Sequence, residues 1–144
     1  LAKKIISVRK TEATKQISKK LHVSLGQQVY EYILLRKIDG VPCILETTYL
    51  DCKRYPDFEK HYTDKTSMGR ILKNIYHRKQ ISGEEHISVT YAGEQEAELL
   101  ETAPDAPLFF TSGVVKDEEE LIIMYYKQLI RGDKFKLVSR IERE

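Results

Sequence analysis

The chain has 144 residues, of which 41% are hydrophobic and 32% are charged, and its formal net charge is +2. This length and composition indicate one globular domain. No stretch approaches the ~20 consecutive apolar residues of a membrane helix, and the opening LAKKIISVRK contains no secretory cleavage pattern. The small net charge does not by itself indicate nucleic-acid binding. Cys43 and Cys52 are too few and too poorly spaced for a disulfide framework or a zinc site, so we expect a cytoplasmic protein.

The first expected elements are a strand, a helix and a hairpin. Apolar and polar residues alternate over positions 6–9, which predicts a strand. Thr11 is a candidate N-cap for a helix whose apolar residues continue at helical spacing to Leu21. Two β-prone runs, 28–38 and 43–50, flank the dipeptide Asp39-Gly40, which is typical of tight hairpin turns.

The middle of the chain predicts two short helices. Tyr55, Phe58 and Tyr62 recur at intervals of three and four, so a short helix would present them on one aromatic face. Thr66 or Ser67 can cap a second helix over 67–77, whose apolar stripe indicates core packing.

The remaining pattern predicts a strand at 86–93, an acidic helix at 94–101, a loop at 103–107, and strands at 107–115, 120–130 and 134–142. The whole order is therefore β-α-β-β-α-α-β-α-β-β-β. Consecutive hairpins with segregated helices predict an α+β fold, with a mostly antiparallel sheet and helices on one side.

No catalytic or metal-binding motif stands out. The four histidines are scattered, and the sequence contains no HExxH, GxSxG or phosphate-binding loop. The acidic run 117–120 lies at an expected hairpin tip, where we interpret it as solvated. The sequence therefore predicts no catalytic residues, no metal site and no cofactor.

Two charged residues lie inside strands that otherwise look buried. Arg36 and Glu46 stand on opposite arms of the expected hairpin, ten positions apart. Because that separation is even and the turn lies between them, their side chains could meet on one face of the sheet. Two interpretations remain open, a ligand-binding pair and a structural ion pair.

The tripeptide Arg131-Gly132-Asp133 resembles an adhesion motif, but its context indicates a turn. Phe135, Leu137 and Ile141 alternate with charged residues directly after it, as in an amphipathic strand. The glycine would then open that strand.

At this point several segments resemble one family. The stretch YILLRKIDGVPCILETTYL is similar to the Arg-x-x-Asp-Gly-x-Pro-x-x-x-Glu hairpin of the UTRA effector-binding domain. SMGRILKN resembles the family's Ser-Leu-Tyr-x-x-Leu helix start, and EHISVTYAGEQEAELLETAPDAPLFFTSGVVKDEE resembles its strand, helix, loop and strand. LIRGDKFKLV resembles the family's ending, in which Arg-Gly-Asp is a turn before a final strand. The four segments occur in the family's order and span nearly the whole chain.

The resemblance implies a UTRA domain over residues 1–144 with a chorismate-lyase-like α+β fold. It also implies the C-terminal half of a HutC-type, GntR-superfamily transcription regulator in the bacterial cytoplasm. We accordingly expect a homodimer that reads operator DNA through an N-terminal winged helix-turn-helix domain absent from this chain. The expected partner of the chain itself is a small-molecule effector, often a phosphorylated sugar in that family.

The resemblance also implies site residues. Arg36 matches an arginine that contacts an anionic group of the ligand, which suits a planar guanidinium fork. Glu46 matches a glutamate that accepts hydrogen bonds from ligand hydroxyls. Thr66 and Ser67 lie where the family has serine or threonine ligands, and Tyr126 is a further candidate.

Some positions depart from the family pattern. Leu34 stands where many relatives have another arginine, while Met124 and Ile130 stand near expected Glu and Tyr positions. These changes favour a less polar or differently shaped effector than a hexosamine phosphate. Tyr125 and Tyr126 could compensate, unless the strand register makes one of them a core residue.

The sequence therefore favours ligand-controlled transcription, with the chain as a sensor and not an enzyme. One alternative is a lyase on the same fold that acts on a small aromatic acid, with Arg36 holding the carboxylate. Another is a stand-alone metabolite-binding module without a DNA-binding domain.

Overall fold

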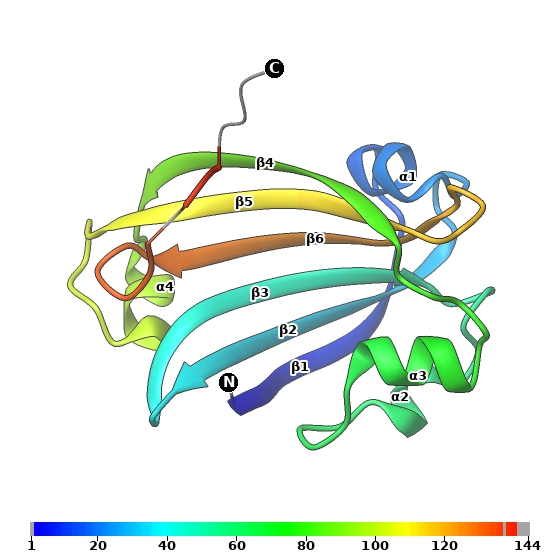
Figure 1. Ribbon diagram of the computed structural model, residues 1–144, viewed down its shortest axis with the longest axis horizontal. Coiled ribbons are helices and arrows are strands. Elements are labelled where there is room, and N and C mark those ends of the chain that lie inside the picture. Colours follow the sequence, from blue (N-terminus) through cyan, green and yellow to red (C-terminus); the bar gives the residue numbers. More distant parts are fainter. Residues whose placement is uncertain (1, 137, 141–144) are drawn as a thin grey trace.

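The computed structural model describes residues 2–136 and 138–140. In this part of the chain, six strands pair into one antiparallel sheet in the order β1-β2-β3-β6-β5-β4, with four short helices around it (Figure 1). The elements are β1 (Ala2–Glu12), α1 (Lys15–Leu21), β2 (Gln28–Ile38), β3 (Val41–Asp51), α2 (Phe58–His61), α3 (Met68–Asn74), β4 (Ser82–Tyr91), α4 (Glu94–Leu100), β5 (Pro107–Lys116) and β6 (Ile122–Arg131). The α+β class and the antiparallel sheet are confirmed. No helix of the described residues is long and apolar enough to cross a membrane.

The β2–β3 hairpin forms where Asp39-Gly40 predicted it. Both residues have a positive φ, 50° at Asp39 and 78° at Gly40, as a type I′ turn requires. The pairing sets Leu34 opposite Glu46. β1 then pairs with β2, and β6 pairs with β3, so this hairpin joins the first edge of the sheet to its second half.

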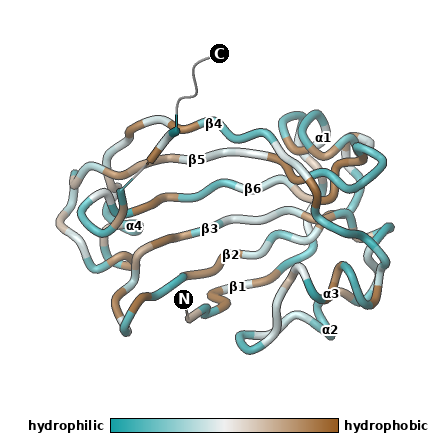
Figure 2. Tube along the Cα trace, in the orientation of Figure 1, coloured by the Kyte–Doolittle hydropathy of each residue, from teal (hydrophilic) through white to brown (hydrophobic). Residues whose placement is uncertain are grey.

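The helices are divided between the two faces of the sheet, whereas the sequence predicted them on one side. α1 and α4 pack on the face that carries Val29, Leu35 and Tyr49. α2 and α3 pack on the opposite face, against Tyr30 and Tyr32. The physical reason lies in β2 and β3, which bury consecutive residues and therefore have two apolar faces to cover. Figure 2 shows these hydrophobic stretches, in contrast to the hydrophilic segment 63–67 between α2 and α3.

An aromatic cluster fixes α2 and α3 on the sheet. Tyr32 meets Tyr62 edge-to-face with ring centroids 5.1 Å apart, and meets Phe58 in the same way at 6.0 Å. Such pairs add about 0.5–1.5 kcal/mol each beyond their burial. Because α2 has only four residues and an isolated helix of that length is unstable, these contacts hold it in place. They also place the segment after α2 over the sheet.

Two expected boundaries shift. β1 continues to Glu12, so the N-cap of α1 is Thr14 and not Thr11; the Thr14 hydroxyl accepts a hydrogen bond from the Ile17 amide at 3.3 Å. The cap of α3 is Ser67, one of the two expected residues. α3 ends at Asn74, earlier than predicted.

The strand predicted over 134–142 does not form in its described residues, 134–136 and 138–140. Leu137, Ile141 and Glu142 lie outside the described residues. A strand that turns back from β6 would need a free side of β6, but β6 already pairs with β3 and β5. Instead, Phe135 packs against the cluster of Cys43, Ile44 and Ile130.

Candidate functional site

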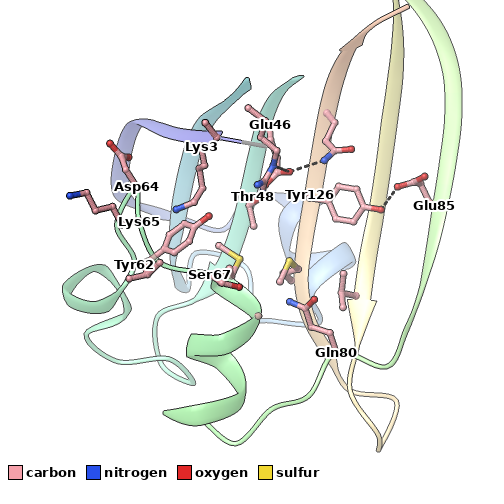
Figure 3. A pocket seen from close by; sticks show the side chains of 18 residues that line it. Lys3, Glu46, Thr48, Tyr62, Asp64, Lys65, Ser67, Gln80, Glu85 and Tyr126 are labelled. Carbon is pink, nitrogen blue, oxygen red and sulfur yellow. Dashed lines mark hydrogen bonds and ion pairs between the residues drawn. The ribbon is translucent and has the colours of Figure 1, made fainter. Parts of the chain in front are cut away.

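A cavity lies between the sheet and the segment that joins α2 to α3. Its volume is about 730 Å³, within the range of about 300–1,000 Å³ typical of small-molecule sites. Residues from all six strands line it, together with Tyr62, residues 64–69 and Gln80 (Figure 3). All five predicted site residues are among them: Arg36, Glu46, Thr66, Ser67 and Tyr126. Their role in binding an effector stays a prediction.

Arg36 and Glu46 form an ion pair at the cavity wall. The Arg36 Nε and Nη2 atoms each lie 3.3 Å from one oxygen of Glu46. The two residues are diagonal neighbours, because Arg36 stands opposite Ile44 in the β2–β3 register. The ion pair is thus observed, and it also borders the cavity, where a role in binding a ligand stays a prediction.

The Glu46 carboxylate accepts further hydrogen bonds from two neighbouring side chains. Thr48 Oγ1 donates to Oε2 at 2.9 Å, and Gln128 Nε2 donates to Oε1 at 2.7 Å. With Arg36, each carboxylate oxygen therefore accepts two hydrogen bonds, which is its normal capacity. Glu46 is 7% exposed, and in this arrangement it holds the Arg36 guanidinium in a fixed orientation.

Lys3 brings a second cation to the same wall, and sequence reasoning missed it. It stands opposite Arg36 in the β1–β2 register. Its Nζ atom lies 4.1 Å from the centroid of the Tyr62 ring and donates to the Thr63 carbonyl. Burial lowers the pKa of Lys3, and the nearby Asp64 carboxylate offsets this only in part. An anion bound beside this lysine would stabilise its charged form.

The segment after α2 completes this wall. The Thr66 hydroxyl accepts from the Thr63 amide at 2.8 Å and donates to the His61 carbonyl at 3.0 Å, so it shapes the loop. Ser67 Oγ accepts from the Arg70 amide at 3.4 Å as the cap of α3. Lys65 also lines the cavity and is exposed. Lys3, Arg36 and Lys65 therefore line the cavity from β1, β2 and the loop, with the charged end of Lys65 pointing outward, away from the cavity (Figure 3).

Tyr126 lies on the other wall, where its hydroxyl donates to the Glu85 carboxylate of β4. Burial raises the pKa of Tyr126, and the hydrogen bond to Glu85 raises it further, so the hydroxyl remains a donor at neutral pH. Tyr125 points to the opposite face of the sheet and stacks on Tyr49 at 5.7 Å. Tyr125 is therefore the one of the two tyrosines that the strand register makes a core residue.

The apolar departures affect the cavity unequally. Leu34 is fully buried in the aromatic core, and Ile130 is buried with Ile44, so neither lines the cavity. Met124 does line it. Only Met124, of the three, changes the surface that a ligand would meet.

The Arg-Gly-Asp tripeptide forms a turn. Arg131 donates to both carboxylate oxygens of Asp133, at 3.1 and 2.8 Å, and to the Leu100 carbonyl at 3.2 Å. The Lys134 amide closes the turn on the Arg131 carbonyl at 3.2 Å. Both charged groups of the tripeptide are thus engaged within the chain.

Known proteins resemble this chain in sequence and in fold. The family model described as the UTRA domain matches residues 1–136. The chain belongs to the UTRA family. Two curated relatives are transcriptional repressors. A probable fructoselysine utilization operon repressor of Escherichia coli K12 is 20% identical over 82% of this chain and 49% of its own length, and PhnF of Mycolicibacterium smegmatis is 27% identical over 79% and 46%. The chain thus spans about half the length of these curated relatives.

Solved structures share the fold of this UTRA chain. The effector domain of PhnF from Mycobacterium smegmatis superposes with a TM-score of 0.92 at 22% identity, over 99% of this chain and 87% of that one. The C-terminal domain of the histidine utilization repressor from Pseudomonas syringae superposes with a TM-score of 0.86 at 15% identity, over 99% of both chains. At these identities the structures establish the fold.

Proposed function

We propose that this UTRA chain binds a small anionic metabolite in the cavity and so controls a DNA-binding domain of the same regulator. The observation that carries the proposal is that Lys3 and Arg36, which are partners in the β1–β2 register, both line the cavity. Glu46 orients the guanidinium of Arg36, and such a fork suits bidentate contact with phosphate or carboxylate. Phosphorylated sugars are the first class of effector to test.

The relatives support the regulatory part of the proposal. Those described above are transcriptional repressors, which favours a regulator over a lyase. The chain matches 63% of a longer PhnF structure, consistent with a protein that also carries a DNA-reading N-terminal domain. We further propose a HutC-type homodimer in the bacterial cytoplasm, in which effector binding changes the arrangement of the two DNA-reading domains. A coupling of about 1–3 kcal/mol would change operator affinity about 5- to 150-fold.

The binding step can be tested on this chain by thermal unfolding with sugar phosphates and small carboxylates. A ligand at 100 times its dissociation constant should add about 2.7 kcal/mol of stability and raise the midpoint by several degrees. We expect Arg36→Ala to weaken that ligand by more than about tenfold, because the charge-assisted contact is lost. The matched control is Arg9→Ala, since Arg9 pairs with Glu31 at 2.7 Å and does not line the cavity.

The outcome at Arg36 decides the proposal. If a ligand binds Arg36→Ala and the unsubstituted chain equally, the proposal of an anion site at Arg36 is wrong. Absence of any shift across phosphates and carboxylates would also contradict it. In the full regulator, an operator affinity unchanged by a bound ligand would contradict the control of DNA binding.

A further inference from the structure

A row of residues crosses four strands on the cavity face and ends at Glu85. Thr48 pairs with Tyr126, Tyr126 with Gly113, and Gly113 with Glu85 in the registers of β3, β6, β5 and β4. Gly113 stands between Tyr126 and Glu85 and allows their side chains to meet. A Cβ atom there would lie 2.7 Å from the Tyr126 hydroxyl oxygen and 2.9 Å from Cζ, closer than van der Waals contact allows. The missing side chain lets the Tyr126 ring extend over β5 to the carboxylate on β4.

Tyr126 therefore holds Glu85 at the cavity wall. The hydrogen bond between them is drawn in Figure 3, with both side chains on the cavity side of their strands. Glu85 is an exposed residue of an edge strand, where a carboxylate would otherwise move freely in solvent. Fixing such a side chain costs rotamer entropy, so the arrangement presents a negative charge at a defined place.

Glu85 differs from the other anchored carboxylates of the sheet in having no cation. Glu46 pairs with Arg36 at 3.3 Å, Glu31 with Arg9 at 2.7 Å, and Asp117 with Arg78 at 3.0 Å. Among the residues that the structure describes, no lysine, arginine or histidine forms an ion pair with Glu85. A negative charge facing a cavity without a cationic partner is complementary to a positively charged ligand group.

The two sides of the cavity carry different charged groups. Lys3 lies on one side of it, with the Asp64 carboxylate nearby, and Tyr126 and Glu85 lie on the other (Figure 3). A ligand with a single anionic group would satisfy only the first side. It would also leave the Glu85 carboxylate facing it across the cavity.

We infer that the effector is bipolar, with an ammonium group that pairs with Glu85 in addition to the anionic group held by the cationic wall. The inference rests on the proposed function and names the chemical class of its ligand, an amine-bearing phosphate or carboxylate. Tyr126 acts as a positioning residue for the carboxylate. Glu85 becomes the residue that discriminates an amine from a hydroxyl at the same place on a ligand.

The test uses pairs of probes that differ at the amine. Glucosamine 6-phosphate is compared with glucose 6-phosphate, and phosphoethanolamine with ethyl phosphate, by calorimetry at neutral pH. We expect the amine member of at least one pair to bind about tenfold more tightly. Glu85→Gln should abolish that preference, because the amide can still accept the Tyr126 hydrogen bond but carries no charge. Glu84→Gln is the matched control, since Glu84 is the preceding residue of β4 and does not line this cavity.

The results separate the inference from the proposed function. If both members of each pair bind equally to the unsubstituted chain, the ammonium subsite is overturned while the anion site stands. If the preference persists in Glu85→Gln, another group recognises the amine and the assignment to Glu85 is overturned. If no member of either pair binds, the inference and the proposed sugar-phosphate site fail together. Measuring the unfolding midpoints of the two variants checks that both remain folded.

Discussion

Arg36 and Glu46 share one ion pair but differ as targets for substitution. Glu46 is almost fully buried, whereas 28% of the Arg36 side chain remains accessible. Removing the guanidinium leaves the carboxylate with donors from Thr48 and Gln128. Removing the carboxylate instead leaves three side chains without the acceptor of their four hydrogen bonds, and unpaired buried groups are costly. Substitution at Arg36 therefore probes binding more cleanly than substitution at Glu46, where stability and binding change together.

Lys3 makes the affinity for an anion depend on pH. Its pKa in the free protein is lowered from 10.5 by burial, whereas a bound anion would favour the charged form and raise it. Affinity should therefore be full below the lowered pKa and decline as pH rises through it. We expect the affinity for glucose 6-phosphate to fall as pH rises from neutral toward 10.5, and to fall less in Lys3→Arg, because arginine does not titrate there.

Calorimetry over that range checks the prediction. Lys4→Arg is the control, since Lys4 is adjacent in β1 but does not line the cavity. An identical pH profile for Lys3→Arg and the unsubstituted chain would mean that the Lys3 charge does not act on the ligand.

At the scale of elements, Asp117 ties the β5–β6 turn to the connection after α3. Its Oδ1 accepts from the Glu119 and Leu121 amides at 2.8 and 3.0 Å, and its Oδ2 accepts from Arg78 at 3.0 Å. The sequence interpretation of a solvated acidic tip is thus wrong for Asp117, which is 5% exposed. An acidic run does not reveal which member turns inward, because the inward residue is chosen by the turn geometry.

This contact should stabilise the fold in a pH-dependent way. Burial alone would raise the pKa of Asp117, but the two backbone amides and Arg78 outweigh it and lower the pKa below 3.8. Stability from a carboxylate with a depressed pKa is present above the unfolded value and is lost as pH falls through the folded one. We expect Asp117→Ala to cost about 2–3 kcal/mol at neutral pH. Asp117→Asn should cost less, because it keeps the Oδ1 acceptor.

Urea unfolding at several pH values measures both effects. The deficit of Asp117→Asn should shrink as pH falls below about 4, where the native aspartate also becomes protonated. Glu119→Gln, an exposed carboxylate of the same turn, should change little at any pH. A deficit that stays constant into acid would exclude the charge of Asp117 as its source.

The sequence predicts those features of the fold and of the site that depend on residues close together in the chain. Asp39-Gly40 and the Ser67 cap depend on neighbouring residues, and the Arg36 and Glu46 pair depends on one hairpin. Glu85 and Gln128 depend on how separate hairpins pair. The Gln128 contact with Glu46, for example, joins residues 82 positions apart. Periodicity gives the buried face of a strand but not its neighbour in the sheet, so these residues carried no signal in the sequence alone.

At the scale of the whole molecule, the two edges of the sheet have different chemistry. β1 forms one edge and β4 the other. The cationic side chains of β1 are Lys3, Lys4, Arg9 and Lys10. Such charges protect an edge from pairing with another strand. β1 also exposes Ile6 and Val8, at 39% and 45%, but β4 exposes larger fractions of Ile87, Val89 and Tyr91, at 49%, 65% and 68%. Of the two edges, β4 is the one suited to association with a second copy of the chain.

The proposed homodimer is therefore expected to involve β4. Dimerisation that accompanies folding makes the unfolding midpoint rise with protein concentration, by mass action. We expect such a rise over a hundredfold concentration range, together with a dimer in sedimentation velocity. Val89→Lys should remove both, because it places a charge on the exposed apolar edge. Leu25→Lys, at a residue equally exposed at 69% but outside the sheet, should leave both unchanged. A dimer that survives Val89→Lys would assign the association to another surface, and a midpoint independent of concentration would contradict a homodimer formed by this chain alone.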